Sequence, residues 1–184
     1  MTPATATATS TWNIDPAHSA AEFKVKHMMI SNVRGKFSGI SGVLNRFDAD
    51  HTKSTLEVSI DATTINTQDA QRDGHLKSAD FLDVEKFPTM TFKSTHIEKK
   101  GEGFANTGDL TIHGVTKPVV LNVEEVSEPA KDPWGNTRIG LTASTKINRK
   151  DFGLVWNSAL EAGGVLVGED VTITLDVEFI KAAE

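Results

Sequence analysis

The stretch from Arg72 to Phe92 holds the densest group of residues that could do chemistry. Arg72, Asp73 and His75 stand within four residues of one another, and further carboxylates follow in RDGHLKSADFLDVEKFPTMTF. A carboxylate near a histidine is an arrangement that general acid/base catalysis uses. The same stretch also contains three of the chain's nine phenylalanines, which are Phe81, Phe87 and Phe92. It therefore fits either an active site or the wall of an apolar pocket with a polar rim.

Few other motifs point to catalysis or to a metal ion. Asp15 and His18 form a second carboxylate–histidine pair, but no GxSxG elbow marks a serine nucleophile. None of the six histidines pairs with another at a metal-binding spacing, and the HExxH motif is absent. The lack of cysteine excludes a thiol nucleophile, a disulfide and a thiolate metal site. The sequence predicts no metal site and no cofactor, although histidines from different strands could still converge.

One cluster of cations follows an alternating segment, at KINRKD, where Lys146, Arg149 and Lys150 stand close together. Three cations at the end of a strand form a solvated rim or hold one anionic head group. The chain contains neither a P-loop nor a GxGxxG motif. The net charge of -6 argues against nucleic acid as a partner.

A chain of 184 residues is most simply one domain. Residues 1–10 are short, polar and uniform, which predicts a disordered tail before a barrel domain over 11–184. The N-terminus lacks the basic and apolar regions of a signal peptide. We therefore expect a cytoplasmic protein, or a periplasmic one if a signal peptide has been removed. No apolar run approaches the roughly 18 residues that a membrane span needs.

Alternation of apolar and polar residues with a period of two dominates the chain after the tail. In the segment 21–27, Ala21, Phe23, Val25 and His27 share one face. Similar alternation recurs around residues 56–60, 90–92, 110–112, 119–123, 139–147 and 171–179. Gly39 and Gly42 predict a bend or bulge of the kind that barrels use at corners. About eight such segments without βα alternation predict an all-β fold, an extended eight-stranded antiparallel barrel.

The segment from Thr67 to Asp83 departs from this alternation. Asp69 is placed to cap a short helix over residues 70–79, and Gly74 is the one residue in it that disfavours a helix. We expect this helix to be a crossover between two strands.

Apolar residues outnumber every polar constellation in the chain. An eight-stranded barrel is either filled by its own side chains or holds one small ligand, and periodicity is the same in both cases. The candidate residues for the wall of a cavity are Phe23, Val25, Phe37, Ile40, Phe81, Leu82, Phe87, Met90, Phe92, Leu110, Ile112, Phe152, Leu154 and Trp156.

Five blocks of the sequence resemble the signature blocks of YceI-like proteins. The match runs in the same order over nearly the whole chain from Trp12, which is far more specific than a short motif. One departure is Leu82, where the family usually has a second phenylalanine. The blocks are WNIDPAHSAAEFKVKHM at 12–28, RDGHLKSADFLDVEKFPTMTF at 72–92, GDLTIHGVTKPVVL at 108–121, NRKDFGLVWN at 148–157 and VGEDVTITLDVEF at 167–179.

The resemblance implies a lipocalin-like barrel that binds a long-chain isoprenoid lipid, without enzymatic activity. It implies polyprenyl phosphate or pyrophosphate, or an isoprenoid quinone, as ligand, and a carrier or store that is often a homodimer. Under this view, Arg72, Asp73 and His75 lie near the barrel mouth, where an ion pair holds the crossover. We expect the lipid head group to contact His18, His113, Arg149 and Asn157.

Two other functions stay open from the sequence. The first is an enzyme that acts on a lipid head group, for instance a hydrolase that uses Asp73 and His75 or a metal ion. The second is a filled barrel that acts in stress protection through its surface. For the lipid carrier and for the enzyme alike, we expect no transmembrane segment and at most a transient contact with a membrane.

Overall fold

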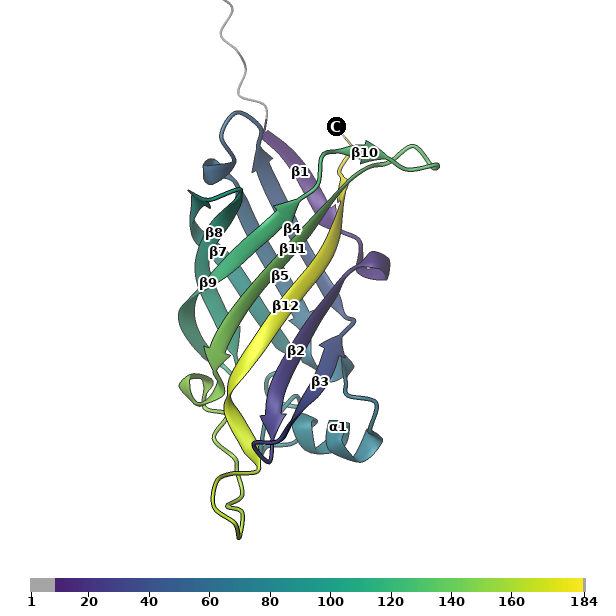
Figure 1. Ribbon diagram of the computed structural model, residues 1–184. Coiled ribbons are helices and arrows are strands. Elements are labelled where there is room, and N and C mark those ends of the chain that lie inside the picture. Colours follow the sequence, from purple (N-terminus) through teal and green to yellow (C-terminus); the bar gives the residue numbers. More distant parts are fainter. Residues whose placement is uncertain (1–8, 184) are drawn as a thin grey trace, which may run out of the picture.

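Alternating apolar residues form long antiparallel strands in the computed structural model, which describes residues 9–183 (Figure 1). The strands are β1 (Thr9–Ile14), β2 (Ala20–His27), β3 (Ser31–Phe37), β4 (Ile40–Phe47), β5 (Thr55–Asp61), β6 (Ile65–Asn66), β7 (Thr89–Lys100), β8 (Gly103–Ile112), β9 (Val115–Val126), β10 (Ala130–Lys131), β11 (Thr137–Asn148) and β12 (Val167–Lys181). The helices are η1 (Pro16–His18), η2 (His51–Lys53), η3 (Ala62–Thr64), α1 (Ala70–Lys77) and η4 (Arg149–Phe152).

Eight of these strands close into a barrel, which confirms the predicted fold. Their order is β11, β9, β8, β7, β5, β4, β1 and β12, and β12 pairs again with β11. The long strand β12 pairs with β1 through Phe179 and with β2 through Leu175. Strands β2, β3 and β6 thus continue the sheet from the same edge of β12 as β1, on the side nearer α1. The chain passes from β3 to β4 at Gly39, whose carbonyl accepts a hydrogen bond from Asp61 N. The predicted bend at Gly39 lies at this corner.

One half of the barrel interior is filled by the protein's own side chains. Trp12 and Ile14 of β1 are buried there with Val123, Ile139 and Phe179. Pairing in register brings Trp12 beside Leu44 of β4, and Leu44 beside Leu56 of β5. Strand β1, which carries Trp12 and Ile14, lies at the end of the barrel farther from α1 (Figure 1).

The helix α1 lies across the other end of the barrel, between β6 and β7 (Figure 1). The side chain of Asp69 caps it by accepting a hydrogen bond from Arg72 N at 3.0 Å. The predicted helix and its cap are present, although α1 ends two residues earlier than expected. None of its residues is fully buried, and its position depends on polar contacts with the preceding segment and on Leu76, which packs against the core.

The structure describes the predicted N-terminal tail only from Thr9. Thr9 and Ser10, which fall in the predicted tail, belong to β1 and pair with Phe47 and Arg46. The remainder of that tail lies outside the described residues. Within residues 9–183, no helix has both the length and the apolar character that a membrane crossing needs.

Candidate ligand-binding cavity

A cavity of about 170 Å³ occupies the half of the barrel nearer α1. Its walls come from β2, β3, β5, β6, β7, β8, β9, β11 and β12, and none of its lining residues belongs to β1 or β4. Leu76 of α1 and the following residues Phe81 and Leu82 cover it. Most of the lining is apolar, so the cavity suits a hydrocarbon group rather than a polar substrate.

Glycines opposite two aromatic rings help to keep this half of the barrel hollow. The Phe23 ring lies against Gly35 on the paired strand, and the Phe92 ring lies against Gly108. A Cβ atom at either glycine would overlap the ring. Each ring therefore lies flat against the wall instead of extending into the cavity.

The structure brings ten of the fourteen predicted wall residues to the cavity. They are Phe23, Val25, Phe37, Phe81, Leu82, Met90, Phe92, Leu110, Ile112 and Leu154. That any of them contacts a ligand stays a prediction.

The other four predicted wall residues lie elsewhere. Ile40 and Phe152 are almost fully buried in the core beside the cavity, because their side chains fill the protein interior. Phe87 packs its ring against His113, with ring centres 4.9 Å apart. Trp156 packs against His75 and Phe81 on the outer side of the covering segment.

Sequence reasoning missed a comparable set of wall residues, all from strands except Leu76 of α1. Their alternation was recognised, but alternation does not distinguish the hollow half of a strand from its filled half. The missed apolar residues are Ala21, Val58, Ile60, Ile65, Leu76, Val119, Leu121, Ile147, Val167, Val171, Ile173 and Leu175.

Arg149 is the one predicted head-group residue that lines the cavity. Its residue surface is only 3% exposed, and its guanidinium donates hydrogen bonds only to backbone carbonyls within the described residues. Nη1 donates to Leu154 O at 2.7 Å and to Trp156 O at 2.9 Å, and Nε donates to Gly168 O at 2.8 Å. Nη2 has one bond, to Val167 O at 3.3 Å, so one of the five N–H groups remains available.

The Arg149 cation carries a cost of burial. No carboxylate of residues 9–183 lies within 4.0 Å of it, and burial lowers the pKa of its guanidinium. Its neighbours in the sequence form exposed ion pairs instead, Lys150 with Glu169 and Lys146 with Asp170. The predicted cation cluster is therefore divided between a solvated rim and a single buried charge.

The other three predicted head-group residues have different surroundings. The Asn157 side chain bonds to both the N–H and the carbonyl of Val167, which fixes the connection between β11 and β12. His113 occupies the β8–β9 turn with φ 54° and packs on Phe87. His18 is exposed in η1 and contacts Asp15. That these residues bind a head group stays a prediction, without support from the shape of the cavity.

The structure separates the proposed acid/base pair Asp73 and His75. Asp73 Oδ1 accepts hydrogen bonds from the N–H and the hydroxyl of Thr67, at 2.8 and 2.6 Å. Arg72 donates to the hydroxyl and the carbonyl of the same Thr67. These residues do hold the crossover, but through Thr67 rather than through a direct ion pair.

His75 instead faces Asp80, with 2.8 Å between Nε2 and Oδ2. Its ring stands edge-on between Phe81 and Trp156, with ring centres 5.0 and 4.7 Å away. Asp80 is half-exposed and no further polar group of the described residues joins the pair. The arrangement braces the segment that follows α1.

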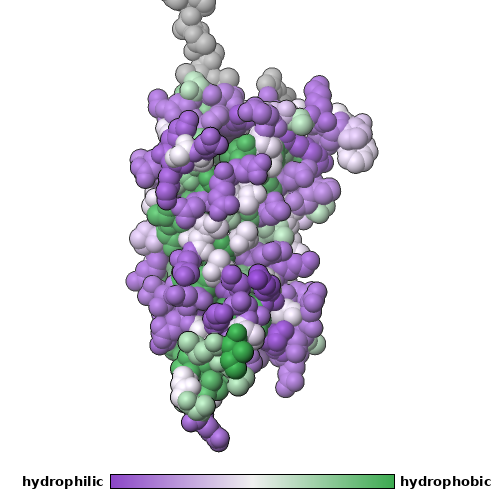
Figure 2. Space-filling model, in the orientation of Figure 1, coloured by the Kyte–Doolittle hydropathy of each residue, from purple (hydrophilic) through white to green (hydrophobic). Residues whose placement is uncertain are grey.

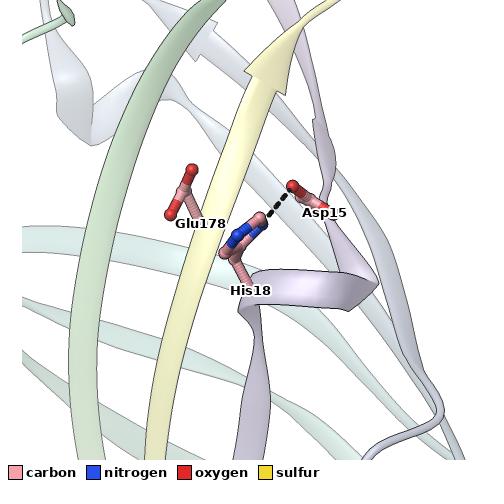
Figure 3. A group of neighbouring side chains, drawn as sticks. All are labelled: Asp15, His18 and Glu178. Atoms are coloured by element: carbon pink, nitrogen blue, oxygen red, sulfur yellow. Dashed lines mark hydrogen bonds and ion pairs between the residues drawn. The ribbon is translucent and has the colours of Figure 1, made fainter. Parts of the chain in front are cut away.

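A second polar cluster lies on the outer surface of the barrel, where Asp15, His18 and Glu178 place their ligand atoms within 4.8 Å of one another (Figure 3). Arg138 Nη1 lies 2.7 Å from Asp15 Oδ2 and 2.7 Å from Glu178 Oε1. Asp15 and Glu178 thus already share a cation, the guanidinium of Arg138. The cluster joins β1, β11 and β12 from outside.

The comparisons with known proteins identify the family. The YceI-like domain family matches residues 12–179. The chain belongs to the YceI-like family. A UPF0312 protein of Vibrio cholerae is 40% identical over 139 residues, which are 75% of this chain and 73% of that protein. A UPF0312 protein of Serratia proteamaculans is 37% identical over 165 residues, or 90% and 82% of the two chains.

Solved structures show the same barrel. The YceI protein of Campylobacter jejuni has a TM-score of 0.70 at 35% identity, and the match covers 86% of this chain and 90% of that one. BcnA of Burkholderia cenocepacia has a TM-score of 0.77 at 21% identity, over 90% and 98% of the chains. A polyisoprenoid binding domain from Saccharophagus degradans has a TM-score of 0.67 at 16% identity, over 95% and 100%. At those two lower identities, the likeness shows the fold.

Proposed function

We propose that this YceI-like protein binds an isoprenoid lipid in the cavity, as a carrier or store. The observation that carries the proposal is a barrel filled at one end and hollow at the other, with an almost wholly apolar lining. The polyisoprenoid binding domain of Saccharophagus degradans, which shares the fold, supports the choice of ligand class. No turnover is part of this proposal.

The tail of the lipid sets the affinity under this proposal. Burial of each methylene group contributes about 0.8 kcal/mol, while a hydrogen bond to a charged group contributes about 1.5–3 kcal/mol. A cavity of about 150 Å³ holds one benzene molecule. The cavity of about 170 Å³ therefore takes a group of roughly isoprene size as it stands. A longer tail needs more room, which outward movement of the cover formed by α1 and Phe81 would provide.

Arg149 is the residue that we assign to the head group. Its remaining N–H and its unpaired charge favour an anionic group, such as a polyprenyl phosphate or pyrophosphate, because a buried cation gains most from a counter-charge. An isoprenoid quinone is the second candidate, since its carbonyl accepts the same N–H. Arg149 also holds the β11–β12 connection, so its substitution would disturb both roles.

The experiment compares two adjacent valines with the same substitution. Val119 lines the cavity, whereas the neighbouring Val120 is 43% exposed on the outer face of β9. Val119→Asp places a carboxylate in the apolar lining, which costs several kcal/mol unless the charge is relieved. We expect the wild-type protein and Val120→Asp to yield an intact isoprenoid on organic extraction and mass spectrometry, and Val119→Asp to yield at least tenfold less.

Two outcomes would refute the proposal. The first is equal lipid recovery from both valine variants when both are folded by circular dichroism. The second is loss of the lipid head group during incubation with the wild-type protein, which would support the enzyme that acts on a head group. The homodimer remains a separate prediction, which light scattering on the purified protein checks.

A further inference from the structure

The turn between β2 and β3 exposes three apolar side chains in succession. Met28, Met29 and Ile30 are 40%, 61% and 78% exposed, and together we call them the apolar tip. Met28 and Met29 also adopt left-handed backbone conformations, with φ 52° and 61°. Tight hairpin turns with such φ values favour Asn, Asp and Gly. Neither burial nor backbone preference within the barrel accounts for large apolar residues at these positions.

The apolar tip continues the end of the barrel that holds the cavity. Met28 N donates a hydrogen bond to Leu166 O at 2.7 Å, one residue before the lining residue Val167. Val25, three residues before the tip, also lines the cavity. Figure 2 shows hydrophobic surface gathered at this end, around the β2–β3 turn and the β11–β12 connection. Because no lining residue belongs to β1 at the opposite end of the barrel, this end is the nearer one to the cavity.

Cations cover the outer face of the same hairpin. Lys24, Lys26, Arg34 and Lys36 stand there with one carboxylate, Glu22, in a chain whose net charge is -6. Lys24 lies opposite Arg34 in the register of the two strands, a like-charge pair that destabilises the hairpin. Among residues 9–183, no carboxylate lies within 4.0 Å of any of the four. We call these four residues the basic hairpin face.

We propose that the apolar tip and the basic hairpin face dock this protein onto an anionic lipid bilayer. The tip enters the interface between head groups and acyl chains, and the cations contact lipid phosphates, which is how amphipathic surface elements bind membranes. In this orientation the hollow end of the barrel faces the bilayer. Passage of a lipid between bilayer and cavity rests on the proposed function, whereas the docking itself does not.

The first test is co-sedimentation of the full chain with two kinds of vesicle. One contains phosphatidylglycerol and phosphatidylethanolamine, and the other contains phosphatidylcholine alone. We expect binding to the anionic vesicles that falls with added salt. Ile30→Asp should lower the partition coefficient at least tenfold, and Lys24→Gln or Arg34→Gln about fivefold each. Trp134→Asp, which replaces a 79% exposed residue in the turn after β10, at the opposite end, is the matched control and should change nothing.

A second readout follows insertion of the tip directly. Because the chain has no cysteine, Met29→Cys and Trp134→Cys each accept one environment-sensitive dye. We expect a blue shift on addition of anionic vesicles for the dye at position 29 only. Equal shifts at both positions, or vesicle binding that Ile30→Asp leaves unchanged, would overturn the proposal. The proposal would also fail if the wild type did not bind vesicles and Ile30→Asp lost self-association. The tip would then be a contact between copies of the chain.

The two proposals fail separately. Val119→Asp should lose its lipid but still bind anionic vesicles, because the substitution lies inside the barrel. Ile30→Asp should still bind lipid that is supplied in detergent, because the tip lies outside the cavity. A protein that docks but never holds lipid refutes only the proposed function, and a protein that holds lipid but does not dock refutes only the docking.

Discussion

The Phe23 ring occupies the space that a Cβ atom at position 35 would fill on the neighbouring strand. The nearest atoms to that Cβ are side-chain atoms of Phe23 and Thr67, not backbone. An added methyl group would therefore displace the ring rather than the strand, and the free space beside the ring is the cavity.

Gly35→Ala should reduce lipid binding through this displacement. We expect a several-fold loss of bound lipid, together with a destabilisation of about 1–3 kcal/mol from overpacking. Quantitative mass spectrometry of extracted lipid and urea unfolding of the delipidated protein measure the two effects. Gly140→Ala is the control, because only Ser127 Oγ approaches its Cβ, at 3.8 Å. Equal lipid recovery from both variants would show that Phe23 does not limit the cavity.

Single residues differ in how far the sequence predicts their roles. Phe23, Met90 and Phe92 were predicted as wall residues because alternation marks the inner face of a strand. The role of Gly35 depends on which residue it pairs with, and the sequence does not contain that register. Arg149 is buried because carbonyls from Leu154 to Gly168 converge on it, which only the folded β11–β12 connection brings about.

Among the elements, α1 is the one that we expect a long lipid tail to displace. It has eight residues, buries none of them fully and is held by the Asp69 cap, by contacts to Thr67 and by Leu76 against the core. Helices this short have little stability of their own. Movement of α1 away from the barrel would therefore cost less than the separation of any barrel strand.

Gly74→Ala tests whether α1 controls entry of the lipid. No atom lies within 4 Å of the added Cβ, so the change acts on helix propensity alone and stabilises α1 by up to about 1 kcal/mol. We expect up to about fivefold slower hydrogen exchange in residues 70–77 and a comparable slowing of lipid uptake. If exchange in α1 slows while the uptake rate stays at the wild-type value, the lipid enters by another route.

Long elements were predictable and short ones were not. The strands β7, β9, β11 and β12 extend over many periods of alternation, and Asp69 marks the start of α1 through its capping chemistry. Strands β6 and β10 contain two residues each, which is too few for a period to be recognised. Their positions follow from the partner strands β3 and β11.

At the scale of the whole molecule, Arg138 links β1 to β12 where these two strands pair and close the barrel. It bonds to Asp15 after β1, to Glu178 of β12 and to Asp132 after β10. The Arg138 guanidinium, and then His18, lower the pKa of Asp15 from 3.8 to about 2. Because this pKa is lowered in the folded state, the stabilisation is complete above about pH 4 and is lost as the pH falls toward 2.

Arg138→Met should therefore destabilise the protein most at neutral pH. We expect the difference in unfolding free energy between variant and wild type to be constant from pH 7 to about pH 4.5 and to shrink between pH 4 and pH 2. Urea unfolding at a series of pH values measures it. Lys93→Met removes an exposed pair with Glu57 and should show little effect at any pH. A difference for Arg138→Met that does not change with pH would place its role in packing alone.

The division of the barrel into filled and hollow halves was not predictable from the sequence. Trp12 and Phe92 are both large, apolar and in alternating segments, yet one fills the packed end and the other lines the cavity. The difference arises because β12 pairs with β1 at the packed end and with β2 at the end that holds the cavity. That placement is a property of the closed sheet and not of any single strand.

Strand β12 pairs with β1, β2 and β11, so it joins segments that lie far apart along the chain. Ser19 and Glu178, for example, share a hydrogen bond across 159 positions of sequence. During synthesis the earlier strands emerge from the ribosome with no partner at this seam. The apolar side chains on their inner faces therefore stay exposed to solvent until β12 has been synthesised. We expect closure of the barrel to be a late and slow step of folding, during which the chain is prone to aggregation.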